Sequence, residues 1–112
     1  MLYSALGFFV LAAVLGLYLL SFILNNKNTP KGVAITHGFF AVIGILLLFI
    51  YPFLYTPSPV TSLVLFIFAA LGGLLLMYRD LTGQPLPKWL ALGHGVTAIL
   101  GFIVLAVFIV HQ

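Results

Sequence analysis

The chain has 112 residues, of which 64% are hydrophobic and 4% charged, and its formal net charge is +3. Because a soluble domain carries about 25% charged residues, this composition excludes a water-soluble globular protein and predicts an integral membrane protein with nearly all of its mass in lipid. Four cations and one acid form no basic surface, so no nucleic-acid partner is expected, and the absence of cysteine excludes disulfides and thiolate metal ligands.

Four apolar stretches follow one another, and each is long enough to cross about 30 Å of hydrocarbon as a helix. We predict spans at 2–24, 33–51, 60–78 and 89–110. The first lacks the basic segment of a signal peptide and is expected to be retained. Polar residues end the first span, and a polar loop follows the third. The prolines of 52–59 predict that the second helix stops before Pro52. Since backbone groups in lipid must be satisfied within the segment, the predicted fold class is all-α, a four-helix transmembrane bundle forming one domain, 1–112.

All four cations lie in two of the loops, and the middle loop and both ends carry none. These cations are Lys27 and Lys31 in the first loop and Arg79 and Lys88 in the third. The positive-inside rule therefore predicts that loops 25–32 and 79–88 are cytoplasmic and both termini outside, as in a bacterial inner-membrane protein. Asp80, the only acid, is expected to be a solvated charge at a helix end with no chemical role.

One unit occurs twice in the chain. Residues 31–48 align without a gap with residues 88–105, an offset of 57 residues, which is the separation of His37 and His94. The same offset places residues 11–17 on residues 68–74. We therefore predict two parallel helical hairpins, repeat 1 at 1–55 and repeat 2 at 56–112, related by a pseudo-two-fold axis along the membrane normal.

Each repeat carries one histidine at the equivalent position. His37 lies six residues beyond Lys31, and His94 lies six beyond Lys88. At 1.5 Å per residue both lie roughly 9 Å inside the boundary marked by the lysines. In a square bundle the second and fourth helices face each other across the axis, so the two imidazoles are expected to approach one small group from opposite sides.

Two imidazoles on opposite sides are the axial ligands that a low-spin haem iron takes, so His37 and His94 are the predicted metal ligands. Glycines would let a flat macrocycle lie against the backbone. The candidate glycines are Gly16 and Gly73, expected at the depth of the histidines, and Gly44 and Gly101, expected to leave space deeper in the bundle. Lys31 and Lys88 are predicted to pair with the haem propionates. The second nitrogen of each imidazole is expected to donate to a carbonyl one turn back in its own helix.

This pattern resembles the membrane-bound cytochromes of b type, whose four-helix bundle carries histidine ligands on its second and fourth helices and glycines on its first and third. The matching residues are His37, His94, Gly16 and Gly73. The resemblance is architectural and covers all four helices. It implies haem b and electron transfer, with a quinone or a partner redox protein. The second histidine pair often present in that group is replaced here by Tyr51 and Phe108, so at most one haem is expected.

Two other functions stay open. Duplication copies a packing histidine as readily as a ligand, so the pair also suits a non-enzymatic scaffold, assembly factor or complex subunit. Parallel repeats occur in small-solute transporters too, although no acid lies within a span. Two histidines without a carboxylate or thiolate give half a zinc site, and no residue is assigned a catalytic role. Apart from the lipid bilayer, a second copy of the chain is a candidate partner.

Overall fold

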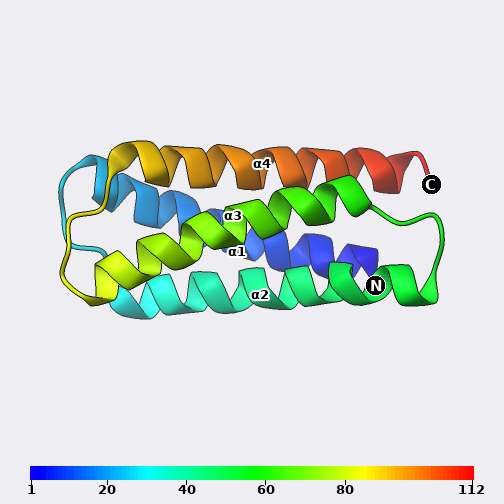
Figure 1. The fold of residues 1–112 in the computed structure, drawn as a ribbon, viewed down its shortest axis with the longest axis horizontal. Helices are drawn as coiled ribbons and strands as arrows, with labels where there is room; N and C mark the ends of the chain where they lie inside the picture. Colours follow the sequence, from blue (N-terminus) through cyan, green and yellow to red (C-terminus); the bar gives the residue numbers. More distant parts are fainter.

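The computed structural model describes residues 1–112 as four helices joined by short turns. The helices are α1 (Leu2–Leu24), α2 (Lys31–Leu54), α3 (Val60–Leu81) and α4 (Lys88–Val110). They run alternately up and down in an elongated bundle of 43 × 20 × 19 Å (Figure 1). Each helix is long and apolar enough to cross a membrane, which confirms the predicted all-α fold class and the four transmembrane helices.

The four helices are arranged as two hairpins, α1–α2 and α3–α4. Packing is most extensive within each hairpin, and the hairpins meet along two narrower seams, α1–α4 and α2–α3. The turns after α1 and α3 lie at one end of the bundle, which we call the charged end because it carries all of the lysines, the arginine and the aspartate. Both termini lie at the opposite, terminal end (Figure 1). Which end faces the cytoplasm stays a prediction.

Two stacked phenyl rings join the hairpins nearer the terminal end. The rings of Phe9 and Phe66 are parallel to within 3°, with centroids 3.8 Å apart. Phe9 lies against Gly44 of α2, and Phe66 lies against Gly101 of α4. The expectation that these two glycines leave space in the bundle is therefore wrong, because the phenyl rings of the neighbouring helices fill it.

Two predicted helix ends are wrong. Helix α2 continues through Pro52 to Leu54, and the Tyr55 N–H still donates to the Tyr51 carbonyl at 2.9 Å. A proline this close to a C-terminus removes one backbone hydrogen bond and leaves the preceding turns intact, so it does not end the helix. Helix α3 runs past residue 78 to Leu81, which places Arg79 and Asp80 in its last turn instead of in a loop.

Candidate functional site

The two repeat histidines meet inside the bundle. His37 on α2 and His94 on α4 have ring centroids 6.1 Å apart, with the ring planes at 89°. Both side chains are half-buried. The placement predicted from the repeat is confirmed: the two hairpins bring one imidazole each to the same depth, from opposite helices.

Each imidazole is hydrogen-bonded to the other helix of its own hairpin. Nδ1 of His37 lies 2.7 Å from the Ala12 carbonyl oxygen, and Nδ1 of His94 lies 2.6 Å from that of Ala69. A carbonyl only accepts, so Nδ1 carries the proton and donates, and Nε2 keeps its lone pair. The expectation of a bond within the histidine's own helix is wrong, because the accepting carbonyl belongs to α1 or α3.

Gly16 and Gly73 explain why those carbonyls can accept. In a helix each Cβ points towards the N-terminus and covers the carbonyl one turn earlier. Gly16 and Gly73 stand four residues after Ala12 and Ala69, so the two carbonyls are left uncovered on that side. A Cβ at Gly16 would lie 2.9 Å from Cε1 of His37, and one at Gly73 would lie 3.0 Å from Cε1 of His94.

The glycines therefore lie at the depth expected for them. The space beside each glycine, which we call a glycine notch, is occupied by the edge of an imidazole ring. The sequence had indicated the glycine–histidine pairing through depth alone. It did not indicate that the histidine of the same hairpin occupies the notch, since nothing in a helical repeat specifies which neighbouring helix a side chain leans on.

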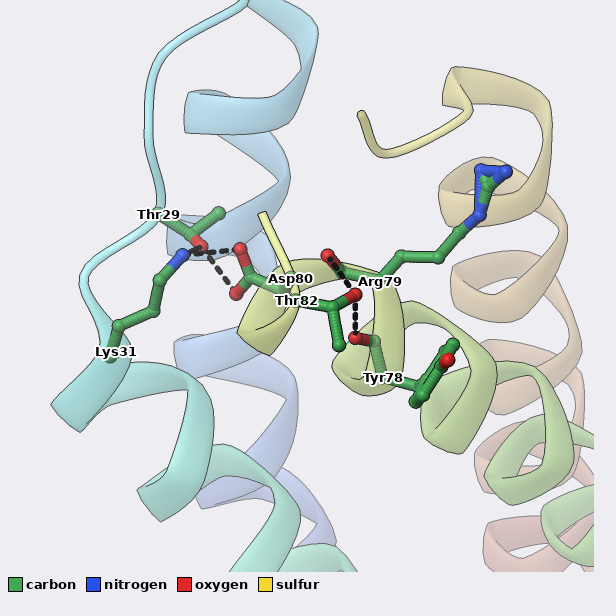
Figure 2. Close-up of polar contacts among 6 residues, drawn as sticks. All are labelled: Thr29, Lys31, Tyr78, Arg79, Asp80 and Thr82. Atoms are coloured by element: carbon green, nitrogen blue, oxygen red, sulfur yellow. Dashed lines mark hydrogen bonds and ion pairs between the residues drawn. The ribbon is translucent and has the colours of Figure 1, made fainter. Parts of the chain in front are cut away.

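A polar cluster at the charged end was not predicted. Asp80 pairs with Lys31 through Oδ1 and accepts from the Thr29 hydroxyl through Oδ2 at 2.6 Å, while Lys31 Nζ also donates to the Thr29 hydroxyl at 3.1 Å (Figure 2). We call Thr29, Lys31 and Asp80 the Asp80 cluster. The Asp80 side chain is only 12% exposed, so the prediction of a solvated charge is wrong. Lys31, predicted to meet a haem propionate, already holds a carboxylate.

The Asp80 cluster has no counterpart in the other repeat. With the 57-residue offset, Asp80 corresponds to Ile23, Thr29 to Leu86 and Lys31 to Lys88. Neither Ile23 nor Leu86 offers a side-chain acceptor to Lys88, and no acid pairs with that lysine. Of the two lysines predicted to meet propionates, Lys88 is the one left free to do so.

The separation of the two rings is that of two imidazoles sharing one metal ion. With metal–nitrogen bonds of about 2.0–2.1 Å, two imidazoles on one metal have ring centroids roughly 6.3 Å apart, close to the 6.1 Å seen here. The hydrogen bonds to Ala12 and Ala69 fix the tautomer that presents Nε2, as outer-sphere partners of ligating histidines do. The glycine notches, in contrast, are filled and offer no bed for a macrocycle.

Other chemistries find less support in the residues. No group of three or more histidine, cysteine, aspartate or glutamate side chains gathers anywhere in the chain, so the pair lacks the further protein ligands of a zinc site. Compared with known protein families, curated proteins and solved structures, the chain matches none of them. The histidine site is therefore the feature of this chain that bears on its function.

Proposed function

We propose that this integral membrane protein is a small b-type cytochrome that holds one haem between His37 and His94 and passes single electrons. The observation that supports it is the convergence of two imidazoles at 6.1 Å, each with Nδ1 engaged and Nε2 free. A bound haem supplies the one-electron redox couple. A quinone or a partner redox protein exchanges electrons with it.

The chain's own contribution is to hold the ligands still. Each imidazole is tied to a carbonyl of its own hairpin, so the orientation of each ring does not depend on contacts with the other hairpin. The carbonyls also increase the basicity of the coordinating nitrogens. Lys88 lies at the charged end and has no acid partner, which supports the proposal that it binds an anionic carboxylate of the haem. We infer from the positive-inside rule that this end is cytoplasmic.

The absorption spectrum of the protein purified from haem-sufficient cells tests this proposal. The wild type is expected to show a Soret band, and His37→Ala or His94→Ala is expected to abolish it. His111→Ala is the matched control, because His111 is exposed beyond α4 and bonds only to the Val107 carbonyl of its own helix. A colourless wild type that also takes up no added haemin would refute the proposal.

A non-enzymatic bundle is the second candidate, favoured by the filled glycine notches. An imidazole edge lying in a notch and donating to a carbonyl is a helix-packing contact in its own right. His94→Gln separates the two functions, since a glutamine amide can still donate to the Ala69 carbonyl but does not replace an imidazole ligand. A bundle held by packing keeps its abundance and partner binding in this variant, whereas a cytochrome loses its haem.

A further inference from the structure

The two seams between the hairpins are built from equivalent positions but are held differently. The α2–α3 seam is crossed at the charged end by the Asp80 cluster, in which Asp80 of α3 is bound by Lys31 at the start of α2 (Figure 2). At the equivalent place of the α1–α4 seam stand Ile23 and Lys88, which form no polar link. The pseudo-two-fold symmetry is thus broken at the one point where a polar contact joins the hairpins at this end.

The chemistry of the Asp80 cluster makes it a strong link. Its bonds are charge-assisted, and its Thr29 member is buried. A carboxylate is disfavoured at the C-terminus of a helix and favoured near an N-terminus. Asp80 lies at the C-terminal end of α3 and reaches the first residue of α2, so separating this seam would leave the charge where its own helix repels it.

We propose that the α1–α4 seam is the side through which the bundle opens to a planar, anionic tetrapyrrole, while the Asp80 cluster keeps the α2–α3 seam closed. This rests on the proposed function, because the tetrapyrrole is its haem. Opening on one side keeps each imidazole hydrogen-bonded and oriented within its own hairpin. Lys88 stands at the mouth of the opening seam, unpaired, where the carboxylates of the incoming ring meet it.

Distances between spin labels test the seams without any ligand. The chain has no cysteine, so pairs can be introduced without background labelling. Gly32→Cys with Leu81→Cys spans the α2–α3 seam, and Leu24→Cys with Trp89→Cys spans the α1–α4 seam. The four positions are exposed, and the two pairs are related by the repeat offset, so each is the matched control of the other.

We expect the α1–α4 pair to give the broader distance distribution. Asp80→Asn, which keeps the side-chain volume, is expected to raise the open fraction of the α2–α3 seam by about fivefold, the weight of an ion pair whose lysine is half-exposed. Equal distributions for the two pairs in the chain with Asp80 intact, or no effect of Asp80→Asn on the α2–α3 pair, would overturn the proposal.

Haemin uptake tests the route. The same cysteine pairs are bridged with a short bismaleimide in the ligand-free protein, and the appearance of the Soret band is followed after haemin is added. Bridging the α1–α4 seam is expected to slow uptake, because it blocks the local opening, while bridging the α2–α3 seam leaves the rate unchanged. Equal slowing by both bridges, or slowing only by the α2–α3 bridge, contradicts the route. If the unbridged chain takes up no haemin, the proposed function fails, and the ligand named here fails with it.

Discussion

Replacing Gly16 by alanine is the sharpest test of how the histidine site is built. The new Cβ would lie 2.9 Å from Cε1 of His37, whereas ordinary carbon–carbon contacts are about 3.5–4.0 Å. The ring has to withdraw by roughly 0.6 Å or more. It is held by a 2.7 Å hydrogen bond to the Ala12 carbonyl, which the added methyl group also covers. The substitution therefore strains the packing and breaks this bond.

The expected cost follows from three contributions. Overpacking a filled site costs about 1–3 kcal/mol. A lost hydrogen bond between transmembrane helices costs about 0.6 kcal/mol on average. Alanine returns at most about 1 kcal/mol of helix propensity relative to glycine. We expect Gly16→Ala to lower the free energy of unfolding by about 1–2 kcal/mol. It should also weaken haem binding, because His37 no longer holds its position.

Equilibrium unfolding in mixed detergent micelles measures this cost, with two controls. Gly7→Ala lies on the same helix with nothing within 4 Å of its added Cβ, so it is expected to be neutral or slightly stabilising. In a His37→Ala background the ring is gone, so Gly16→Ala should lose most of its cost, which a double-mutant cycle detects. Equal effects of Gly16→Ala and Gly7→Ala, or the same cost with and without His37, would refute the described packing.

Three further substitutions probe the surrounding packing. Gly44→Ala puts a Cβ 2.7 Å from the ring of Phe9, whose movement is restricted by the ring of Phe66 stacked on it at 3.8 Å. We expect the free energy of unfolding to fall by about 2–3 kcal/mol in the same assay. The loss should be smaller for Gly101→Ala, whose Cβ would lie 3.3 Å from Phe66. Asp80→Asn should lower the free energy of unfolding by about 1 kcal/mol, a small value because the Lys31 side chain is 46% exposed to solvent. The loss should become smaller at high salt, which screens the ion pair. Lys88→Gln, which removes no ion pair, should leave the unfolding free energy unchanged. Ser62→Ala removes a 2.8 Å hydrogen bond to the Gly101 carbonyl and should cost less than about 1 kcal/mol, because the equivalent position in the other repeat is the buried Ala5; a larger loss would contradict that equivalence.

The helices and the meeting of the histidines were predictable because both depend on local or repeated features. Hydropathy over a window of one span identifies a transmembrane helix wherever it packs. The depth of His37 and His94 follows from their equal distance from Lys31 and Lys88, and the repeat places them on opposite helices. No knowledge of side-chain packing is needed for either step.

The packing inside the bundle was not predictable in the same way. Lipid is as apolar as a protein core, so the sequence does not distinguish a phenylalanine that faces lipid from one that faces the axis. The positions of Phe9 and Phe66, which fill the sites of Gly44 and Gly101, were therefore missed. The hydrogen bonds of the histidines were also not predicted, because Ala12 and Ala69 accept through their backbone carbonyls and their side chains give no sign of it in the sequence.

The Asp80 cluster was missed because its partners are distant in the chain and it breaks the repeat. Asp80 lies 49 residues from Lys31 and 51 from Thr29, and no periodicity links them. The repeat predicts the same role for Lys31 and Lys88, but in the structure Lys31 pairs with Asp80 and Lys88 has no acid partner. The presence of a single acid in an apolar chain could have indicated an ion pair, because an unpaired charge at a membrane boundary costs free energy.

The spin state and amount of haem in the purified protein show whether His37 and His94 hold one iron between them. We expect one haem per chain with the electron paramagnetic resonance spectrum of low-spin ferric iron, and loss of this signal together with the haem when either His37 or His94 is replaced by alanine. A spectrum that stays low-spin in both variants, or a wild-type protein that binds no haem under conditions in which His111→Ala and wild type fold alike, would contradict it.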